Sequence, residues 1–196
     1  MFIFDDYSLY LWSQWNAKNL YQLASIFAII IAATQFAGEV SKNTMSFYLT
    51  RPVTRRDGFL GKIAAGLLVF IFIFGGGTII FMVTSSIMGY EADWARLSVA
   101  LGISLTWVAV YYLLACIVST LNREPIMAGI VAGVIGLFLS LPGIFAVSRS
   151  FSIFYQMRAV DYFVTDTPLL WSLIPGLAVN GVLLLIGLRV FERKDF

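Results

Sequence analysis

Five long apolar stretches constrain this chain more than any other feature of its sequence. Each approaches the length of about 20 residues that a helix needs to cross a lipid bilayer. They lie at about 20–38, 59–84, 97–121, 126–147 and 169–190. With 60% hydrophobic and only 12% charged residues, a water-soluble chain of this size could not hide its apolar surface. The sequence predicts an all-α fold, a polytopic transmembrane bundle with five visible spans in one domain over residues 1–196.

Composition excludes several classes of function. The net charge of +2 is too small for an electrostatic nucleic-acid binder. The chain has no histidine, which excludes a Ser-His-Asp triad and a His-ligated metal site. No Asp, Glu, Lys or Arg lies deep in a span, which argues against an ion-coupled transporter and a carboxylate-based membrane enzyme. We therefore expect no catalytic residue and no metal site. The single cysteine, Cys116, lies in an apolar run and is expected to be buried.

The basic residues indicate the orientation of the chain, because they accumulate on the cytoplasmic side of a membrane. Nine of the 13 lie in alternate loops on one side: Lys42, Arg51, Arg55, Arg56, Lys62, Arg123, Arg189, Arg193 and Lys194. We therefore predict a cytoplasmic C-terminus and an extracytoplasmic N-terminus. Nothing in residues 1–19 explains how the N-terminus crosses the membrane. We thus expect a preceding helix that is missing here, through truncation or a misplaced start.

The loop after the first span mixes charged and apolar residues over positions 38–58. Thr44 or Ser46 can cap a short helix along the membrane surface. Arg51-Pro52 would end that helix, because the residue before proline avoids the α region. Two interpretations remain open. The loop either sets topology and touches anionic lipid, or it docks a cytosolic partner.

The residues of this loop follow the order GE-x4-T-x4-LTRPVTR-x4-LGK. The chain ends in Phe-Glu-Arg-Lys-Asp-Phe at 191–196, and its fourth span is interrupted by Leu141-Pro142-Gly143. Together these features resemble the ABC-type 2 exporter permeases over essentially the whole chain. The matching loop positions are Glu39, Thr44, Leu49, Arg51, Pro52, Val53, Thr54, Arg55, Leu60, Gly61 and Lys62. Departures are Asn43, Met45 and five spans where the family has six.

The resemblance implies a permease subunit that binds no cofactor itself and works with a separate cytosolic ABC ATPase, which binds the ATP. It also implies a homodimer or a heterodimer with a second permease, a bacterial inner membrane, contact with membrane lipid, and a short helical hairpin before the last span. The short helix at 44–50 would be the cytoplasmic coupling helix. The implied ATPase-docking residues are Glu39, Lys42, Thr44, Leu49, Arg51, Pro52, Arg55 and Arg56.

Gly61-Lys62 does not belong to a phosphate loop, because Ile63 follows where that motif needs Ser or Thr. Lys62 is instead expected to extend toward the membrane surface. Within the spans, Gly75-Gly76-Gly77 favours a bend or close packing, and Gly129 with Gly133 favours close helix packing over a gating hinge. Asn180 lies near the middle of the fifth span, where it either bonds another helix or lines a transport path.

The sequence thus supports an exporter permease that transports an unidentified substrate outward. The alternative is a non-transporting membrane scaffold or assembly factor, or an inactive truncated permease. ATP dependence separates the two, because only a permease should alter the activity of its ATPase.

Overall fold

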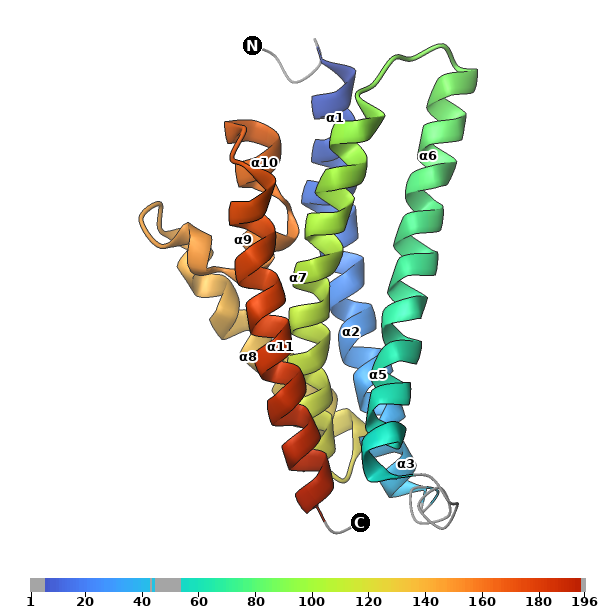
Figure 1. Cartoon of the computed structure of the whole chain (residues 1–196), viewed down its shortest axis with the longest axis vertical. Coiled ribbons are helices and arrows are strands. Elements are labelled where there is room, and N and C mark those ends of the chain that lie inside the picture. The colour runs from blue at the N-terminus through green and yellow to red at the C-terminus, as the bar shows by residue number, and fades with distance from the viewer. Residues whose placement is uncertain (1–5, 43, 45–53, 195–196) are drawn as a thin grey trace.

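Five long helices dominate the structure, a computed structural model that describes residues 6–42, 44 and 54–194. Each of the five is long and apolar enough to cross a membrane, and the described residues contain no strand. They run over Tyr7–Ser41, Arg55–Ile87, Trp94–Leu121, Pro125–Ile144 and Leu169–Arg193. The predicted all-α bundle of five spans is confirmed. Because the number of spans is odd, the two chain ends lie at opposite ends of the bundle (Figure 1).

Helix α7 (Trp94–Leu121) lies at the centre of the bundle. It packs against α2 (Tyr21–Gln35), α8 (Pro125–Ser140) and α11 (Leu169–Arg193), as Figure 1 shows. Its buried residues point in all directions around the helix axis, which is expected of a helix that is apolar on every side. Helices α2, α8 and α11 are therefore positioned largely by their contacts with α7, whereas α5 (Arg55–Phe70) packs more against α11 and α2.

The first helix begins well before the predicted start near residue 20. It opens as α1 (Tyr7–Gln14), and the side chain of Asp6 caps it by accepting hydrogen bonds from the backbone N–H groups of Ser8 and Leu9 at 2.8 and 3.3 Å. It ends with α3 (Ala37–Ser41). The early residues were not predicted as helix because they carry more polar groups than a membrane span usually does.

A π-helical turn over Trp15–Leu20 joins α1 to α2 and buries a polar residue. Asn16 is almost fully buried, and its Nδ2 donates a hydrogen bond to Ser104 Oγ on α7 at 3.2 Å. Buried polar groups are stable when they are paired in this way. The polar residues of this segment therefore belong to the helix.

The second long helix also contains a π-helical turn. α5 (Arg55–Phe70) continues through Ile71–Gly75 into α6 (Gly76–Ile87). Such turns are common where the regular hydrogen-bond ladder of a helix is disturbed. Of the three glycines singled out in the sequence, only Gly75 lies in this turn. Gly77 instead allows close packing, because a Cβ atom there would lie 2.9 Å from the Trp15 ring. Beyond this turn α6 exposes large apolar side chains such as Ile79 and Ile80, as a lipid-facing helix does.

The fourth span is shorter than its predicted range of 126–147. Helix α8 ends at Ser140, and a single 3₁₀ turn over Leu141–Ile144 follows. Pro142 has no N–H group to continue the helical ladder. The chain then forms two short helices, α9 (Ile153–Met157) and α10 (Val160–Thr165), before α11 begins. These are the short helices that the family resemblance implied.

Two residues with left-handed backbone conformation flank α10. Ala159 precedes it with φ of 53°, and Asp166 follows it with φ of 52°. A side chain in this region costs about 1 kcal/mol relative to glycine. The two bends are maintained by their surroundings, since Ala159 is buried and Asp166 pairs with an arginine of α7.

Small residues let the helices approach closely. A Cβ atom on Gly129 or Gly133 of α8 would lie 3.4 or 3.9 Å from the side chain of Ile29 on α2. Gly129 and Gly133 therefore face α2 at ordinary contact distances, and the close packing predicted for them stays a prediction. Cys116 on α7 is fully buried, also as predicted.

Candidate functional site

The described members of the predicted docking set lie at the end of the bundle that carries the C-terminus, where Figure 1 labels α3 and α5. Glu39 lies on α3, Lys42 follows it, and Thr44 is exposed. Arg55 and Arg56 form the first turn of α5. Leu49, Arg51 and Pro52 lie outside the described residues, as does most of the predicted coupling helix.

An ion pair joins α3 and α5, the two helices on either side of this loop. Lys62 Nζ on α5 lies 2.5 Å from Glu39 Oε2 on α3 and donates a hydrogen bond to the backbone oxygen of Gln35 at 2.7 Å. The Lys62 side chain is only 10% exposed. A carboxylate and a carbonyl therefore hold its ammonium group at this end of the bundle. That Lys62 lies at the membrane edge stays a prediction.

Tyr112 of α7 extends this junction to a third helix. Its hydroxyl donates a hydrogen bond to Gln35 Oε1 at 2.7 Å and lies 3.3 Å from the backbone oxygen of Lys62. Gly66 makes room for the ring, because a Cβ atom there would lie 2.0 Å from the hydroxyl oxygen. Helices α2, α5 and α7 therefore meet at one buried polar point.

Two further contacts fasten the start of α5 and the end of α7 to α11. Arg55 Nη1 donates hydrogen bonds to the backbone oxygens of Glu192 and Lys194 at 3.1 and 2.9 Å. Lys194 Nζ in turn donates to the backbone oxygen of Thr120. Burial and the nearby charge of Arg123 lower the pKa of Lys194. Arg56, by contrast, is exposed and makes no ion pair with the described residues.

Three fully buried aromatic rings lie beneath these polar contacts. Phe36, Phe59 and Phe191 form a triangle with ring centroids 5.4–5.9 Å apart. Such aromatic pairs stabilise beyond their buried area. The sequence analysis missed this triangle, because each phenylalanine on its own is also typical of a lipid-facing position. The only signal was their position at the ends of the apolar stretches beside the loop motif.

Asn180 makes the predicted interhelical contact and also borders a groove that could serve as a transport path. Its Nδ2 donates a hydrogen bond to the backbone oxygen of Thr106 on α7 at 2.9 Å, which makes it an interhelical contact. Its Oδ1 is buried without a hydrogen-bond partner among the described residues. Asn180 also lines an apolar groove of about 500 Å³ between α5, α7 and α11. A role in a transport path stays a prediction.

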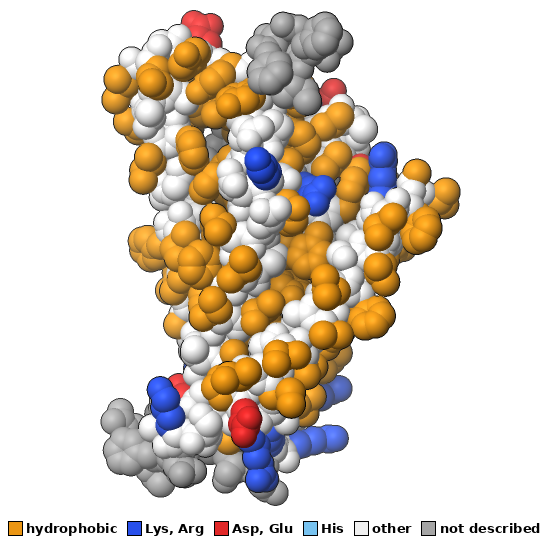
Figure 2. Space-filling view, turned by 180° about the vertical axis from the view of Figure 1, so that it is seen from behind, with side chains coloured by type: hydrophobic (Ala, Val, Ile, Leu, Met, Phe, Trp, Pro, Cys, Tyr) orange, Lys and Arg blue, Asp and Glu red, His pale blue; other side chains and the backbone are white. Residues whose placement is uncertain are grey.

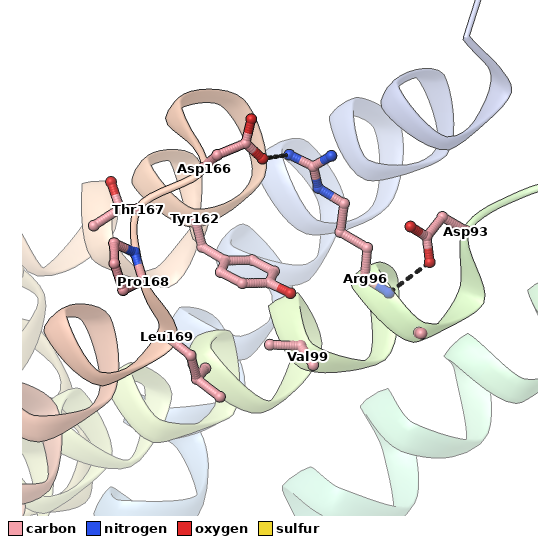
Figure 3. Close-up of a pocket in the computed structure, with 9 residues that line it drawn as sticks. Asp93, Arg96, Val99, Tyr162, Asp166, Thr167, Pro168 and Leu169 are labelled. Carbon is pink, nitrogen blue, oxygen red and sulfur yellow. Dashed lines mark hydrogen bonds and ion pairs between the residues drawn. The ribbon is translucent and has the colours of Figure 1, made fainter.

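A second pocket lies at the opposite end of the bundle (Figure 3). Arg96 on α7 forms an ion pair with Asp166 and donates a hydrogen bond to the backbone oxygen of Phe163 at 2.8 Å. The pocket measures about 420 Å³ and is also lined by Tyr162 and Thr167. These contacts fasten α10 to the start of α7. Sequence analysis missed the pair because its members lie far apart in the chain.

The described residues bring no catalytic constellation together. They contain no group of three or more His, Cys, Asp or Glu side chains that could hold a metal ion. At the C-terminal end, side-chain contacts join the two ends of the loop to one another and to α7 and α11. Four of the five long helices are therefore connected near this loop.

Comparison with known proteins identifies the family. The sequence model described as ABC-2 family transporter protein matches residues 13–158, which is most of the chain. No curated protein and no solved structure matches the chain. The matched region contains the loop, the central helix and the interrupted fourth span. The chain is therefore a member of the ABC-2 transporter family and a membrane component of transport.

Proposed function

We propose that this chain is the transmembrane permease of an ATP-driven exporter, and that a separate cytosolic ATPase docks on the loop between α3 and α5. Membership of the ABC-2 family supports the transport role. The proposed docking residues are those predicted from the sequence, with Arg56 the best placed of those described. ATP is bound and hydrolysed by the partner, and this chain moves in response.

The observation that carries the proposal is the attachment of both ends of the loop. Glu39 holds the end of α3 against Lys62 of α5, and Arg55 holds the start of α5 against the end of α11. A displacement of the loop is therefore passed to several helices at once. Rigid-body movement of packed helices is a common way to convert a local event into a global transition.

Charge favours an acidic partner surface. Lys42 and Arg56 are exposed at this end, and neither forms an ion pair with the described residues. Unpaired cations on an exposed surface attract and orient a partner of opposite charge. A cytosolic ATPase with an acidic rim around its docking groove would complement them.

The remaining parts of the proposal concern the assembly. We assign the loop and the C-terminus to the cytoplasm of a bacterium, because basic residues accumulate there. The permease pairs with a second copy or with a sister permease. The groove that contains Asn180 is the proposed route for an apolar part of the substrate.

The test reverses one exposed charge. We expect Arg56→Glu to weaken co-purification of the ATPase with this chain from detergent-solubilised membranes about tenfold, since like charges would then face each other. Arg123→Glu is the matched control, because it makes the same change in the exposed α7–α8 turn at the same end. Equal binding by wild type and Arg56→Glu would contradict docking at this loop.

ATP hydrolysis by the co-purified complex separates transport from scaffolding. A permease should change the rate of phosphate release by its ATPase, and Arg56→Glu should abolish that change. A partner that binds with an unaltered rate of hydrolysis would favour the non-transporting scaffold.

A further inference from the structure

Basic side chains form a row across the rear face of the bundle, near the end that carries the N-terminus (Figure 2). Three basic residues lie in the helical segments of this half of the molecule: Lys18 in the π-helical turn, Arg149 in a 3₁₀ turn and Arg158 directly after α9. Unlike Arg96, none of the three forms an ion pair with a described residue. We call these three residues the basic row.

Arg158 ties the row to the first helix. Its guanidinium lies 4.3 Å from the centroid of the Tyr21 ring, and its backbone oxygen accepts a hydrogen bond from Trp12 Nε1 at 2.9 Å. Its Nε is buried and has no hydrogen-bond partner among the described residues. An unpaired cationic N–H group in a buried position is costly.

Arg149 is held beside the row by an aromatic ring. Its guanidinium lies 5.4 Å from the centroid of the Tyr155 ring, and the Tyr155 hydroxyl donates a hydrogen bond to Asp161 Oδ1 at 2.6 Å. Asp161 therefore lies close to this part of the row, yet it forms no ion pair with Arg149 within the described chain. The row thus keeps an excess of positive charge.

A polar stripe on the first helix surrounds Lys18. Gln14, Lys18 and Gln22 are exposed at a spacing of four residues, and the next exposed residues on this side are Ile26 and Ile30. Residues spaced by four share one face of a helix. The exposed side of the first helix therefore changes from polar to apolar just below Gln22.

Beside Arg149, the side chains of Val147 and Phe151 are 99% and 81% exposed, which suits insertion among acyl chains.

We propose that the basic row binds the phosphate group of an anionic phospholipid in the leaflet at the N-terminal end of the bundle. Lys18, Arg149 and Arg158 supply the charge, and Gln22 supplies a further donor or acceptor. Val147 and Phe151 contact the acyl chains of the same leaflet. This proposal needs neither an ATPase nor transport, so it stands or falls independently of the proposed function.

The test measures lipid selectivity of the full chain reconstituted in phosphatidylcholine vesicles. The probes are spin-labelled phosphatidylglycerol and spin-labelled phosphatidylcholine, and the readout is the motionally restricted lipid fraction. We expect Lys18→Gln together with Arg149→Gln to lower the preference for phosphatidylglycerol at least fivefold. Arg158 is left unchanged in this variant, because its contacts with Tyr21 and Trp12 also stabilise the fold. The variant that conserves both charges, Lys18→Arg with Arg149→Lys, should keep the wild-type preference for phosphatidylglycerol.

The matched control removes two exposed charges from the other end, through Arg123→Gln and Arg193→Gln. An equal loss of selectivity in this control would overturn the proposal, as would unchanged selectivity in the basic-row variant. Complete displacement of the labelled lipid by inorganic phosphate would also overturn it, because the site would then serve a soluble anion.

Discussion

Tyr112 shows how much of this structure depends on single polar atoms inside an apolar bundle. Its hydroxyl is the hydrogen-bond donor for Gln35 Oε1. We expect Tyr112→Phe to lower the free energy of unfolding by about 1–3 kcal/mol, because a buried acceptor is left without its donor. Thermal unfolding in detergent measures this. Tyr90→Phe is the control, since Tyr90 is exposed, and an equal loss in both variants would contradict the assigned role.

Gly66 and Gly61 form a matched pair on the same helix. A Cβ atom on Gly66 would overlap the Tyr112 hydroxyl, whereas a Cβ atom on Gly61 meets nothing within 4 Å. We expect Gly66→Ala to destabilise the protein by about 1–3 kcal/mol through overpacking. Gly61→Ala should stabilise it by up to about 1 kcal/mol through helix propensity. Circular dichroism during heating distinguishes the two, and the same sign of shift in both would refute this packing argument.

At the scale of elements, α10 is held between two left-handed residues. Ala159→Gly should be neutral or stabilise the protein by about 1 kcal/mol, because glycine adopts φ of 53° without strain. Ala178→Gly, at an exposed position inside α11, should instead cost about 1 kcal/mol. Melting temperatures of the two variants provide the measurement. A clear loss of stability in Ala159→Gly would mean that the bend is not strained.

Prediction from sequence succeeded for elements that consist of one uninterrupted apolar stretch and failed where polar residues are buried. Helix α7 was predicted because every side of it is apolar. The segment before Leu20 was missed, because Asn16 looks unsuitable for a membrane helix until Ser104 is seen opposite it. The docking loop was predicted by its motif, but its attachment through Lys62 and Arg55 depends on contacts with distant helices. Such contacts leave no local pattern in the chain.

At the scale of the whole molecule, the single long helix between them, Arg55–Ile87, places the two loops of a labelling experiment at opposite ends of the bundle. In a Cys116→Ala background, we expect Glu91→Cys to react with a membrane-impermeant maleimide in intact cells. Ser41→Cys should react only after permeabilisation, because the basic end is expected to face the cytoplasm. Both positions are exposed. The reverse pattern would invert the orientation predicted from charge.

The π-helical turn in the first helix has a consequence for its periodicity. Buried residues recur along this helix at every fourth position: Trp12, Asn16, Leu20, Ala24, Ala28, Ala32 and Phe36. In a regular α-helix, successive residues at that spacing drift around the axis by about 40°. The wider turn at Trp15–Leu20 counteracts this drift and keeps the upper and lower parts of the seam in phase. Deleting a single residue there would rotate everything above it by about 100°, turning Trp12 away from Arg158, so this short segment tolerates substitution far better than a change of length.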